Sequence, residues 1–227
     1  MEIRTGLSYG DALLVPQRSA VDSRSDIDLT TRLTPSLTLD IPLVSAAMDT
    51  VTEAETAAAL ADLGGLGVIH RFLSIDEQAA EVRQVAEQGG PVAAAVGIDE
   101  DYLDRTAAIL DAGGDAVVLD VAHGHMERAL DAVAEIRAEY DPEIIAGNVV
   151  TPDAVEDLYD AGADCVKVGV GPGSHCTTRE VAGAGYPQLS AVDECADRAD
   201  ELGITVMADG GIQNSGDAAK ALMAGAS

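Results

Sequence analysis

Short apolar segments recur along the chain at nearly even intervals, and each is followed by a segment with helical periodicity. Most of the apolar segments are continuous, which is typical of strands buried on both faces of a sheet. The predicted strands are Ile41–Met48, Leu66–His70, Pro91–Gly97, Asp115–Gly124, Glu143–Val149, Cys165–Gly171 and Ile204–Gly211. The predicted helices cover 53–63, 75–88, 99–112, 126–140, 152–161, 189–202 and 215–224.

Local signals mark several helix ends. Two predicted helices begin with a hydroxyl residue followed three positions later by glutamate, which is the spacing of a capping box. These pairs are Thr52 with Glu55 and Ser74 with Glu77. Thr151 and Pro152 fit an N-cap followed by proline at the first helical position. Glycines that should end helices are Gly64, Gly113 and Gly162.

Strands that alternate with helices predict a parallel sheet with right-handed crossovers. A doubly wound sheet usually has about five or six strands, whereas a (β/α)₈ barrel has eight in about 250 residues. The even spacing therefore favours an α/β fold of the TIM-barrel type, incomplete, with about seven of the eight β–α units. We expect residues 1–227 to be one domain from which the last strand is missing, with 1–40 as an irregular or hairpin cap.

Composition narrows the class of protein. Apolar residues make up 47% of the chain, so it is not a disordered sequence. The net charge of -27, from 40 acidic and 13 basic residues, disfavours binding to nucleic acid or anionic membranes. The acidic residues are scattered rather than grouped in one tail, which suggests the solvated surface of a halophilic protein. No apolar run has the length of a membrane span and no secretory signal is visible, so we expect a cytoplasmic location.

Polar residues and glycines gather after the predicted strands, where barrel enzymes carry their chemistry. The segment GPGS, Gly171–Ser174, offers backbone N–H groups and a hydroxyl, as an anion-binding nest does. The segment DGG, Asp209–Gly211, ends the last predicted strand, and its carboxylate suits ribose hydroxyls. Neither segment has the Walker lysine or the Rossmann pattern. Together these segments predict a site for a phosphorylated ligand.

Cysteines and histidines offer two kinds of chemistry. Cys176 comes just after the predicted nest, where N–H dipoles favour a reactive thiolate. Cys165 and Cys195 fall in a strand and a helix, and we assign both to packing. A rival hypothesis is a metal hydrolase site. It would use four residues: His123, His125, His70 and Asp209.

The stretch GADCVKVGVGPGSHCTTREVAGAGYPQLSAV, residues 162–192, resembles the IMP dehydrogenase / GMP reductase family. The resemblance extends to SYGDALLVP, SAAMDTVTEAE, GGLGVIHR, DVAHGH, AGNVVT and ADGGI. It implies a TIM barrel, usually in a homotetramer, in which a cysteine attacks C2 of a purine nucleotide. In the dehydrogenase, hydride leaves C2 to NAD and water releases XMP. In the reductase, ammonia leaves GMP and NADPH delivers hydride to give IMP.

The resemblance also implies a role for individual residues. The implied catalytic residues are Cys176 and Thr178. The implied substrate contacts are Ser45, Met48, Asn148, Ser174, Asp209, Gly210 and Gly211. The implied cofactor contacts, for NAD or NADP, are Asp120, Gly169, Val170 and Gly171. The implied K⁺ ligands are the backbone carbonyls of Gly171, Gly173 and Cys176. His175 departs from the family pattern, which usually has isoleucine or valine there.

Two features bear on which member of the family this is. SAAMDTVTE and DVAHGH look like the dehydrogenase, whereas GAGYPQLSAV looks like the reductase. The regulatory CBS pair that the dehydrogenase commonly inserts is not expected, because EVRQVAEQGGPVAAAVG passes directly between two predicted units. We favour the dehydrogenase, with the reductase and an inactive nucleotide-binding fragment as alternatives. The residues that separate the two activities are expected beyond Ser227.

Overall fold

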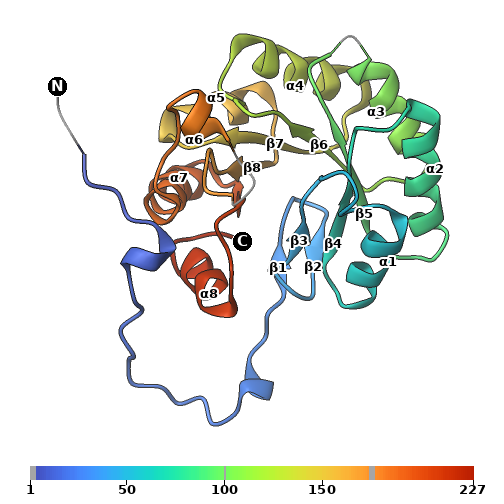
Figure 1. Cartoon of the computed structure of the whole chain (residues 1–227). Helices are drawn as coiled ribbons and strands as arrows, with labels where there is room; N and C mark the ends of the chain where they lie inside the picture. Colours follow the sequence, from blue (N-terminus) through green and yellow to red (C-terminus); the bar gives the residue numbers. More distant parts are fainter. Residues whose placement is uncertain (1–3, 100, 174–176) are drawn as a thin grey trace.

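The computed structural model describes residues 4–99, 101–173 and 177–227. Its centre is a seven-stranded parallel sheet in which each strand pairs with the next along the chain. In Figure 1 this sheet curls into part of a barrel with the helices on its outer side. The predicted α/β fold, an incomplete TIM barrel, is therefore confirmed. The strands are β3 (Val44–Ser45), β4 (Leu66–Ile69), β5 (Val92–Val96), β6 (Ala116–Asp120), β7 (Glu143–Val149), β8 (Cys165–Val168) and β9 (Thr205–Ala208).

A helix follows every strand of this sheet, as the sequence predicts. The helices are α1 (Ala54–Asp62), α2 (Ile75–Ala86), α3 (Tyr102–Asp111), α4 (Glu127–Tyr140), α5 (Pro152–Ala161), α6 (Thr178–Val181), α7 (Gln188–Leu202) and α8 (Ser215–Met223). The short helix α6 was not expected. Several strands end earlier than predicted, because the polar residues and glycines after them belong to the loops of the site. For example, β8 ends at Val168 rather than Gly171.

Most of the predicted helix ends are confirmed, but one is wrong. Ser74 and Glu77 form the expected capping box of α2, and the Thr151 hydroxyl accepts from the Ala154 N–H at α5. Gly64, Gly113 and Gly162 all have positive φ, as expected at helix ends. The Thr52 box is absent: the N-cap of α1 is Glu53, so Thr52 lies one residue before it, and the Thr52 hydroxyl donates to the Ala46 carbonyl.

Successive side chains along each strand point to opposite faces of the sheet, and the two faces belong to two separate apolar cores. Val117 and Leu119 of β6 pack outward against the helices, whereas Ala116 and Val118 of the same strand face the barrel interior. The inner core also contains the alanines Ala93 and Ala95 of β5. The next inward position on β6, Asp120, is polar and lines the cavity described below. Because side chains alternate between the two faces of a strand, Asp120 points to the interior as Ala116 and Val118 do, at the carboxyl end of β6.

An antiparallel hairpin closes the other end of the interior. Its strands are β1 (Thr31–Arg32) and β2 (Thr38–Leu39). Leu33, Leu37 and Leu39 join the inner core, and the Thr205 hydroxyl donates to the Leu33 carbonyl. The hairpin matches the cap expected within 1–40.

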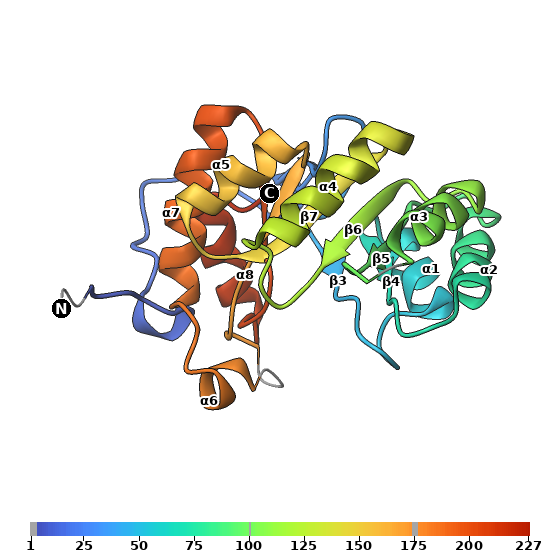
Figure 2. The same cartoon turned by 90° about the horizontal axis from the view of Figure 1, so that it is seen from above.

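Before the hairpin, the chain runs as an extended arm with two 3₁₀ turns, η1 (Tyr9–Asp11) and η2 (Arg24–Asp26). The first turn, η1, packs against α8, where the Lys220 ammonium donates to the Tyr9 carbonyl at 2.6 Å. Beyond η1, the arm loops away from the body in Figure 1 and passes outside α7 in Figure 2, and it exposes the apolar side chains of Leu13 and Val15. The helices found in the described ranges all fall short of the length and apolar character that a membrane span requires.

Candidate functional site

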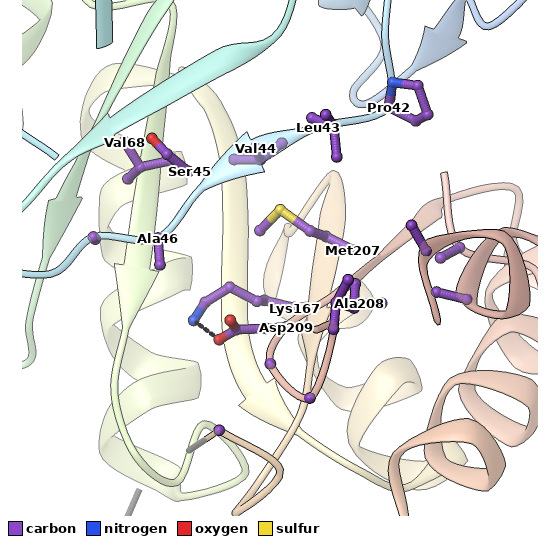
Figure 3. Close-up of a pocket in the computed structure, with 18 of the residues that line it drawn as sticks. Pro42, Leu43, Val44, Ser45, Ala46, Val68, Lys167, Met207, Ala208 and Asp209 are labelled. Atoms are coloured by element: carbon purple, nitrogen blue, oxygen red, sulfur yellow. Dashed lines mark hydrogen bonds and ion pairs between the residues drawn. The ribbon is translucent and has the colours of Figure 1, made fainter. Parts of the chain in front are cut away.

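The carboxyl ends of the strands surround a cavity of about 630 Å³. Figure 3 shows that side chains from β3, β8 and β9 point into it. Its lining is apolar on the side of Val44, Val68 and Met207 and polar near Asp120 and Asp209. An apolar cavity with a few convergent polar groups is the usual form of a small-molecule site. Of the residues predicted from the sequence, the cavity brings together Ser45, Met48, Asp120, Gly173, Asp209, Gly210 and Gly211.

Lys167 is the central charged residue of this cavity and was not among the residues predicted from the sequence. Its ammonium nitrogen lies 2.7 Å from Asp120 Oδ1, 2.7 Å from Asp209 Oδ2 and 2.5 Å from Asn148 Oδ1. These four residues lie at or next to the carboxyl ends of four consecutive strands, β6 to β9. The Lys167 side chain is only 10% exposed, so its charge is stabilised by these partners rather than by bulk water.

The Lys167 ammonium group and the Asp209 carboxylate stabilise each other's charged form. Burial alone would lower the pKa of Lys167, but the carboxylates of Asp209 and Asp120 outweigh it and raise that pKa. Burial likewise favours the neutral form of Asp209, but the Lys167 ammonium outweighs it and the Asp209 pKa is lowered. Lys167 is therefore cationic and Asp209 anionic near neutral pH. The site presents fixed acceptors to a ligand with hydroxyl groups.

Asn148 ties the neighbouring loops together. Its amide nitrogen donates to the Gly169 carbonyl at 2.8 Å and to Asp209 Oδ2 at 2.6 Å. Buried Gln188 adds a second tie, donating to the carbonyls of Val168 and Asp209. No sequence motif indicated Gln188, because its role depends on where α7 packs. These bonds set the position of the Asp209 carboxylate beside Lys167.

Glycines allow the backbone after β8 and β9 to approach closely. Gly169 has φ +155°, and a Cβ there would lie 2.0 Å from the Asp209 carbonyl oxygen. Gly171, Gly210 and Gly211 also have positive φ, a conformation that other residues rarely adopt. A Cβ on Gly210 would lie 3.2 Å from the Gly173 nitrogen, so the loops after β8 and β9 lie side by side. This paired, glycine-rich backbone suits a phosphate group.

Several predicted residues cannot be placed in this geometry. Ser174, His175 and Cys176 lie outside the described residues, so the nucleophile and one substrate contact stay predictions. Thr178 is described as the first residue of α6. The other two cysteines are fully buried, and desolvation raises the pKa of each thiol to about 12. Their assignment to packing is confirmed.

The structure does not support the rival metal hydrolase site. His125 Nε2 lies 2.7 Å from Asp157 Oδ2, His123 is exposed, and Asp209 is bonded to Lys167. Within the described ranges, one group of three side chains has metal-ligand spacing, namely Asp49, Glu53 and His70. That group contains neither His123 nor His125, so the HGH pattern does not form a cluster with the strand-end carboxylate.

The chain matches the family model described as the IMP dehydrogenase / GMP reductase domain over residues 6–227. It is 34% identical to an inosine-5′-monophosphate dehydrogenase of Nitrosopumilus maritimus over 352 aligned positions, covering 100% of the chain and 74% of the relative. It is 39% identical to the Cryptosporidium parvum enzyme of that name, covering 99% and 66%, and 35% identical to that of Aquifex aeolicus, covering 100% and 72%. The chain thus spans two thirds to three quarters of the length of these relatives.

Proposed function

Since the chain belongs to the IMP dehydrogenase / GMP reductase family, we propose that the protein oxidises IMP at C2 with NAD and water, giving XMP and NADH. The observation that carries this proposal is the convergence of Lys167, Asp120, Asp209 and Asn148 in one cavity at the carboxyl ends of the strands. The relatives named inosine-5′-monophosphate dehydrogenase support the choice of this reaction over the reductase.

The nucleotide contacts follow from the two sides of the cavity. Asp209 offers a carboxylate to the ribose hydroxyls, and the backbone of Gly210 and Gly211, with Ser174, receives the phosphate. Ser45 and Met48 line the opposite wall, where the purine ring finds apolar contacts. The separation between a charged end and an apolar wall supports a ligand with a phosphorylated sugar and a flat base.

The cofactor contacts lie beside the same lysine. Asp120 is the residue through which the nicotinamide half of NAD would be held, with the backbone of Gly169, Val170 and Gly171 next to it. NAD, when bound, supplies the acceptor for the hydride that leaves C2. The residues present fit this role, because a carboxylate at the end of β6 can accept from ribose hydroxyls. Initial rates with IMP and NADP, compared with those with IMP and NAD, distinguish the two cofactors.

The covalent step is assigned to Cys176. Its thiolate Sγ forms a bond to C2, the C2–H bond breaks as hydride leaves, and water then releases XMP and restores the thiol. Thr178 takes part in proton transfer near this sulfur. For K⁺ we propose the backbone carbonyls of Gly171, Gly173 and Cys176 as ligands, since a glycine-rich turn exposes its carbonyl oxygens. The positive φ of Gly171, +82°, supports such a turn.

Three broader features of the protein belong to this proposal. A homotetramer is supported by the exposed apolar side chains of the N-terminal arm, such as Leu13 at 88% exposure. A cytoplasmic location suits an enzyme of purine nucleotide synthesis. A halophilic surface is supported by the net charge of -27. Repulsion among these charges should make the free energy of unfolding rise with salt concentration, and urea titrations at low and high salt test this.

The proposed nucleophile is tested by trapping. A purine nucleotide with an electrophilic C2 substituent should label the protein once, and mass spectrometry of the digest should place the label on Cys176. Cys176→Ala should lose both the label and turnover. Cys195→Ala, which removes a buried thiol, is the matched control and should keep the label. Labelling of Cys176→Ala at the wild-type rate would refute the assignment.

A further inference from the structure

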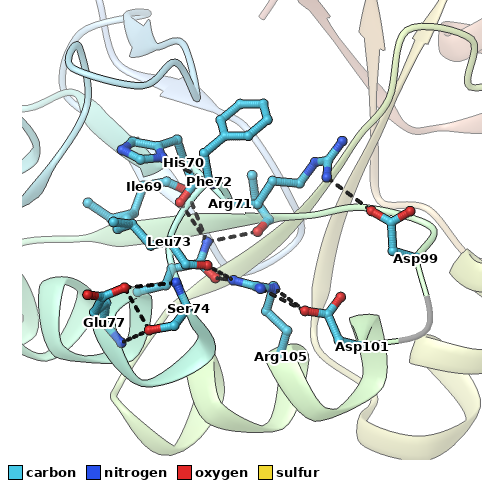
Figure 4. Close-up of polar contacts among 12 residues, drawn as sticks. Ile69, His70, Arg71, Phe72, Leu73, Ser74, Glu77, Asp99, Asp101 and Arg105 are labelled. Atoms are coloured by element: carbon cyan, nitrogen blue, oxygen red, sulfur yellow. Dashed lines mark hydrogen bonds and ion pairs between the residues drawn. The ribbon is translucent and has the colours of Figure 1, made fainter.

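His70 is a buried imidazole close to the loop that carries Met48, one of the residues lining the nucleotide cavity. It follows β4, and its side chain is 1% exposed. Its backbone is held by Gln78 of α2, whose side-chain amide donates to the His70 carbonyl at 3.1 Å and to the Ala95 carbonyl at 2.8 Å. Arg105 in turn donates to Gln78 Oε1 at 2.9 Å. Figure 4 shows this buried set of polar contacts under the segment that follows β4.

The ring of His70 has one satisfied nitrogen and one unsatisfied nitrogen. The Phe72 N–H donates to Nδ1 at 3.2 Å, so the proton of the neutral ring is on Nε2. Nε2 is buried and has no hydrogen-bond partner in the described part of the chain. A buried N–H without a partner is uncommon in folded proteins. The ring therefore presents a donor that still needs an acceptor.

Two carboxylates stand just beyond bonding distance of this donor. Glu53 Oε1 lies 3.6 Å and Asp49 Oδ1 lies 3.8 Å from His70 Nε2. Both acidic side chains are more than half exposed, so a small rotation brings either oxygen within reach. A metal ion is the other occupant that these three side chains suggest. A metal ion would need the lone pair of Nε2. Because the Phe72 N–H donates to Nδ1, the proton of the neutral ring is on Nε2 and that lone pair is not available.

Asp49 and Glu53 belong to the loop that carries the cavity wall. The loop runs from β3 to α1 as residues 46–53, and Met48 faces the cavity. One side of the loop is already held, since buried Thr52 donates to the Ala46 carbonyl at 2.6 Å. The two carboxylates are on the side that meets His70. Whatever fixes them also fixes Met48 against the purine.

We propose that His70 is a positioning residue for the nucleotide: its Nε2–H anchors loop 46–53 through the carboxylates of Asp49 and Glu53. The anchor holds Met48 and Ser45 in place when the purine is seated. His70 does not touch the substrate, and it acts only through this loop. The inference rests on the proposed function to the extent that the ligand seated there is a purine nucleotide.

Four variants of the full-length protein test the anchor. His70→Leu removes the donor, and His70→Gln keeps an N–H with similar reach. The double variant Asp49→Ala/Glu53→Ala removes the acceptors from the surface, and Glu55→Ala on the exposed face of α1 is the matched control. Dissociation constants for IMP and GMP are measured by calorimetry, and hydrogen exchange of the 46–53 amides is measured without ligand.

We expect His70→Leu and the double variant each to weaken nucleotide binding about tenfold and to speed amide exchange in 46–53. His70→Gln should recover most of the affinity. Combining His70→Leu with the double variant should add little, because all three side chains serve one interaction. If His70→Leu does not fold, the comparison of the double variant with Glu55→Ala decides the question.

Three results would overturn the anchor. They are unchanged exchange and affinity in the double variant, full additivity of the combined substitutions, and stoichiometric binding of Zn²⁺ or Mn²⁺ that depends on His70. Failure of the purine-nucleotide assignment has a different signature, since the wild-type protein would then bind neither IMP nor GMP. The exchange measurement would still test the anchor in that case.

Discussion

The ammonium nitrogen of Lys167 lies 2.7 Å from the carboxylate of Asp209, at the point where two neighbouring strands of the barrel end. The same nitrogen lies equally close to Asp120 on the other side. If Asp209 holds the nucleotide and Asp120 the cofactor, one lysine supports both contacts. The following predictions separate these roles.

Replacing Lys167 should lower the free energy of unfolding more than a substitution on the surface would. Lys167→Met leaves two partly buried carboxylates without their cation, and we expect a loss of about 3 kcal/mol in the free energy of unfolding. Lys167→Arg keeps the charge and should lose less. Lys220→Met is the control, because Lys220 is similarly shielded but has one nearby carboxylate, that of Asp217. Urea denaturation measures all three, and equal losses for the two methionine variants would contradict the special role of Lys167.

The lowered pKa of Asp209 leads to a prediction of how the stability of the protein depends on pH. Its pKa is lowered in the folded protein, because the Lys167 ammonium outweighs the effect of burial. A lowered pKa means that the unfolded state binds more protons in acid. The stabilisation is thus complete above the ordinary aspartate pKa of about 3.9 and is lost as pH falls through the folded value.

Denaturation curves between pH 7 and pH 3 measure this effect. The wild-type protein should lose stability in acid more steeply than Asp209→Asn, in which the titrating carboxylate is gone. In Lys167→Met the Asp209 contribution should vanish or change sign, since burial then acts alone. Parallel acid profiles for wild type and Asp209→Asn would show that the Lys167–Asp209 pair does not carry the dependence.

Substitutions of Asp209 and Asp120 should affect the binding of different ligands. Asp209→Asn should raise the KM for IMP and Asp120→Asn the KM for NAD, each by about 10- to 100-fold, because a hydrogen bond to a charged group contributes roughly 1.5–3 kcal/mol. Each variant keeps one carboxylate beside Lys167, so each serves as the control for the other. Initial-rate kinetics with one ligand varied at a time distinguish them. An equal rise of both KM values in both variants would mean that the pair acts only on the fold.

The close approach at Gly169 predicts a strong effect from a single methyl group. Gly169→Ala places a Cβ 2.0 Å from the Asp209 carbonyl oxygen, so the loops after β8 and β9 must separate. We expect a loss of at least about 2 kcal/mol in stability together with weaker nucleotide binding. Gly10→Ala is the control, because nothing lies within 4 Å of its added Cβ. Wild-type nucleotide affinity in Gly169→Ala would show that this approach does not position Asp209.

Much of the fold was predictable because strands and helices have different patterns of apolar residues in the sequence. Continuous apolar segments marked the strands, and Ser74, Thr151 and Gly162 marked helix ends by local chemistry. Thr52 misled the prediction, since its hydroxyl found a tertiary acceptor, the Ala46 carbonyl, in place of the helix cap. Local signals are reliable where the partner is close in sequence and fail where it is not.

The site was predictable in part for the same reason. Asp209 was expected because it lies at the end of a predicted strand, Asp120 was expected from the family resemblance, and Lys167 had a signal that was not used. Cys165 faces the interior, so a period of two places Lys167 on the same side, as the only charged residue within β8. Gln188 and the link from Asn148 to Asp209 had no such signal. They depend on how α7 and β7 pack against distant loops.

The most direct measurement is turnover of the purified full-length protein at high K⁺, with IMP and NAD in one assay and GMP and NADPH in another. We predict NADH formation matched by XMP in the first, no NADPH oxidation in the second, and a loss of at least about 10³-fold in Cys176→Ala, as expected for removal of a nucleophile. Oxidation of NADPH by GMP with release of IMP and ammonia, while IMP and NAD give no NADH, would contradict the proposed dehydrogenase.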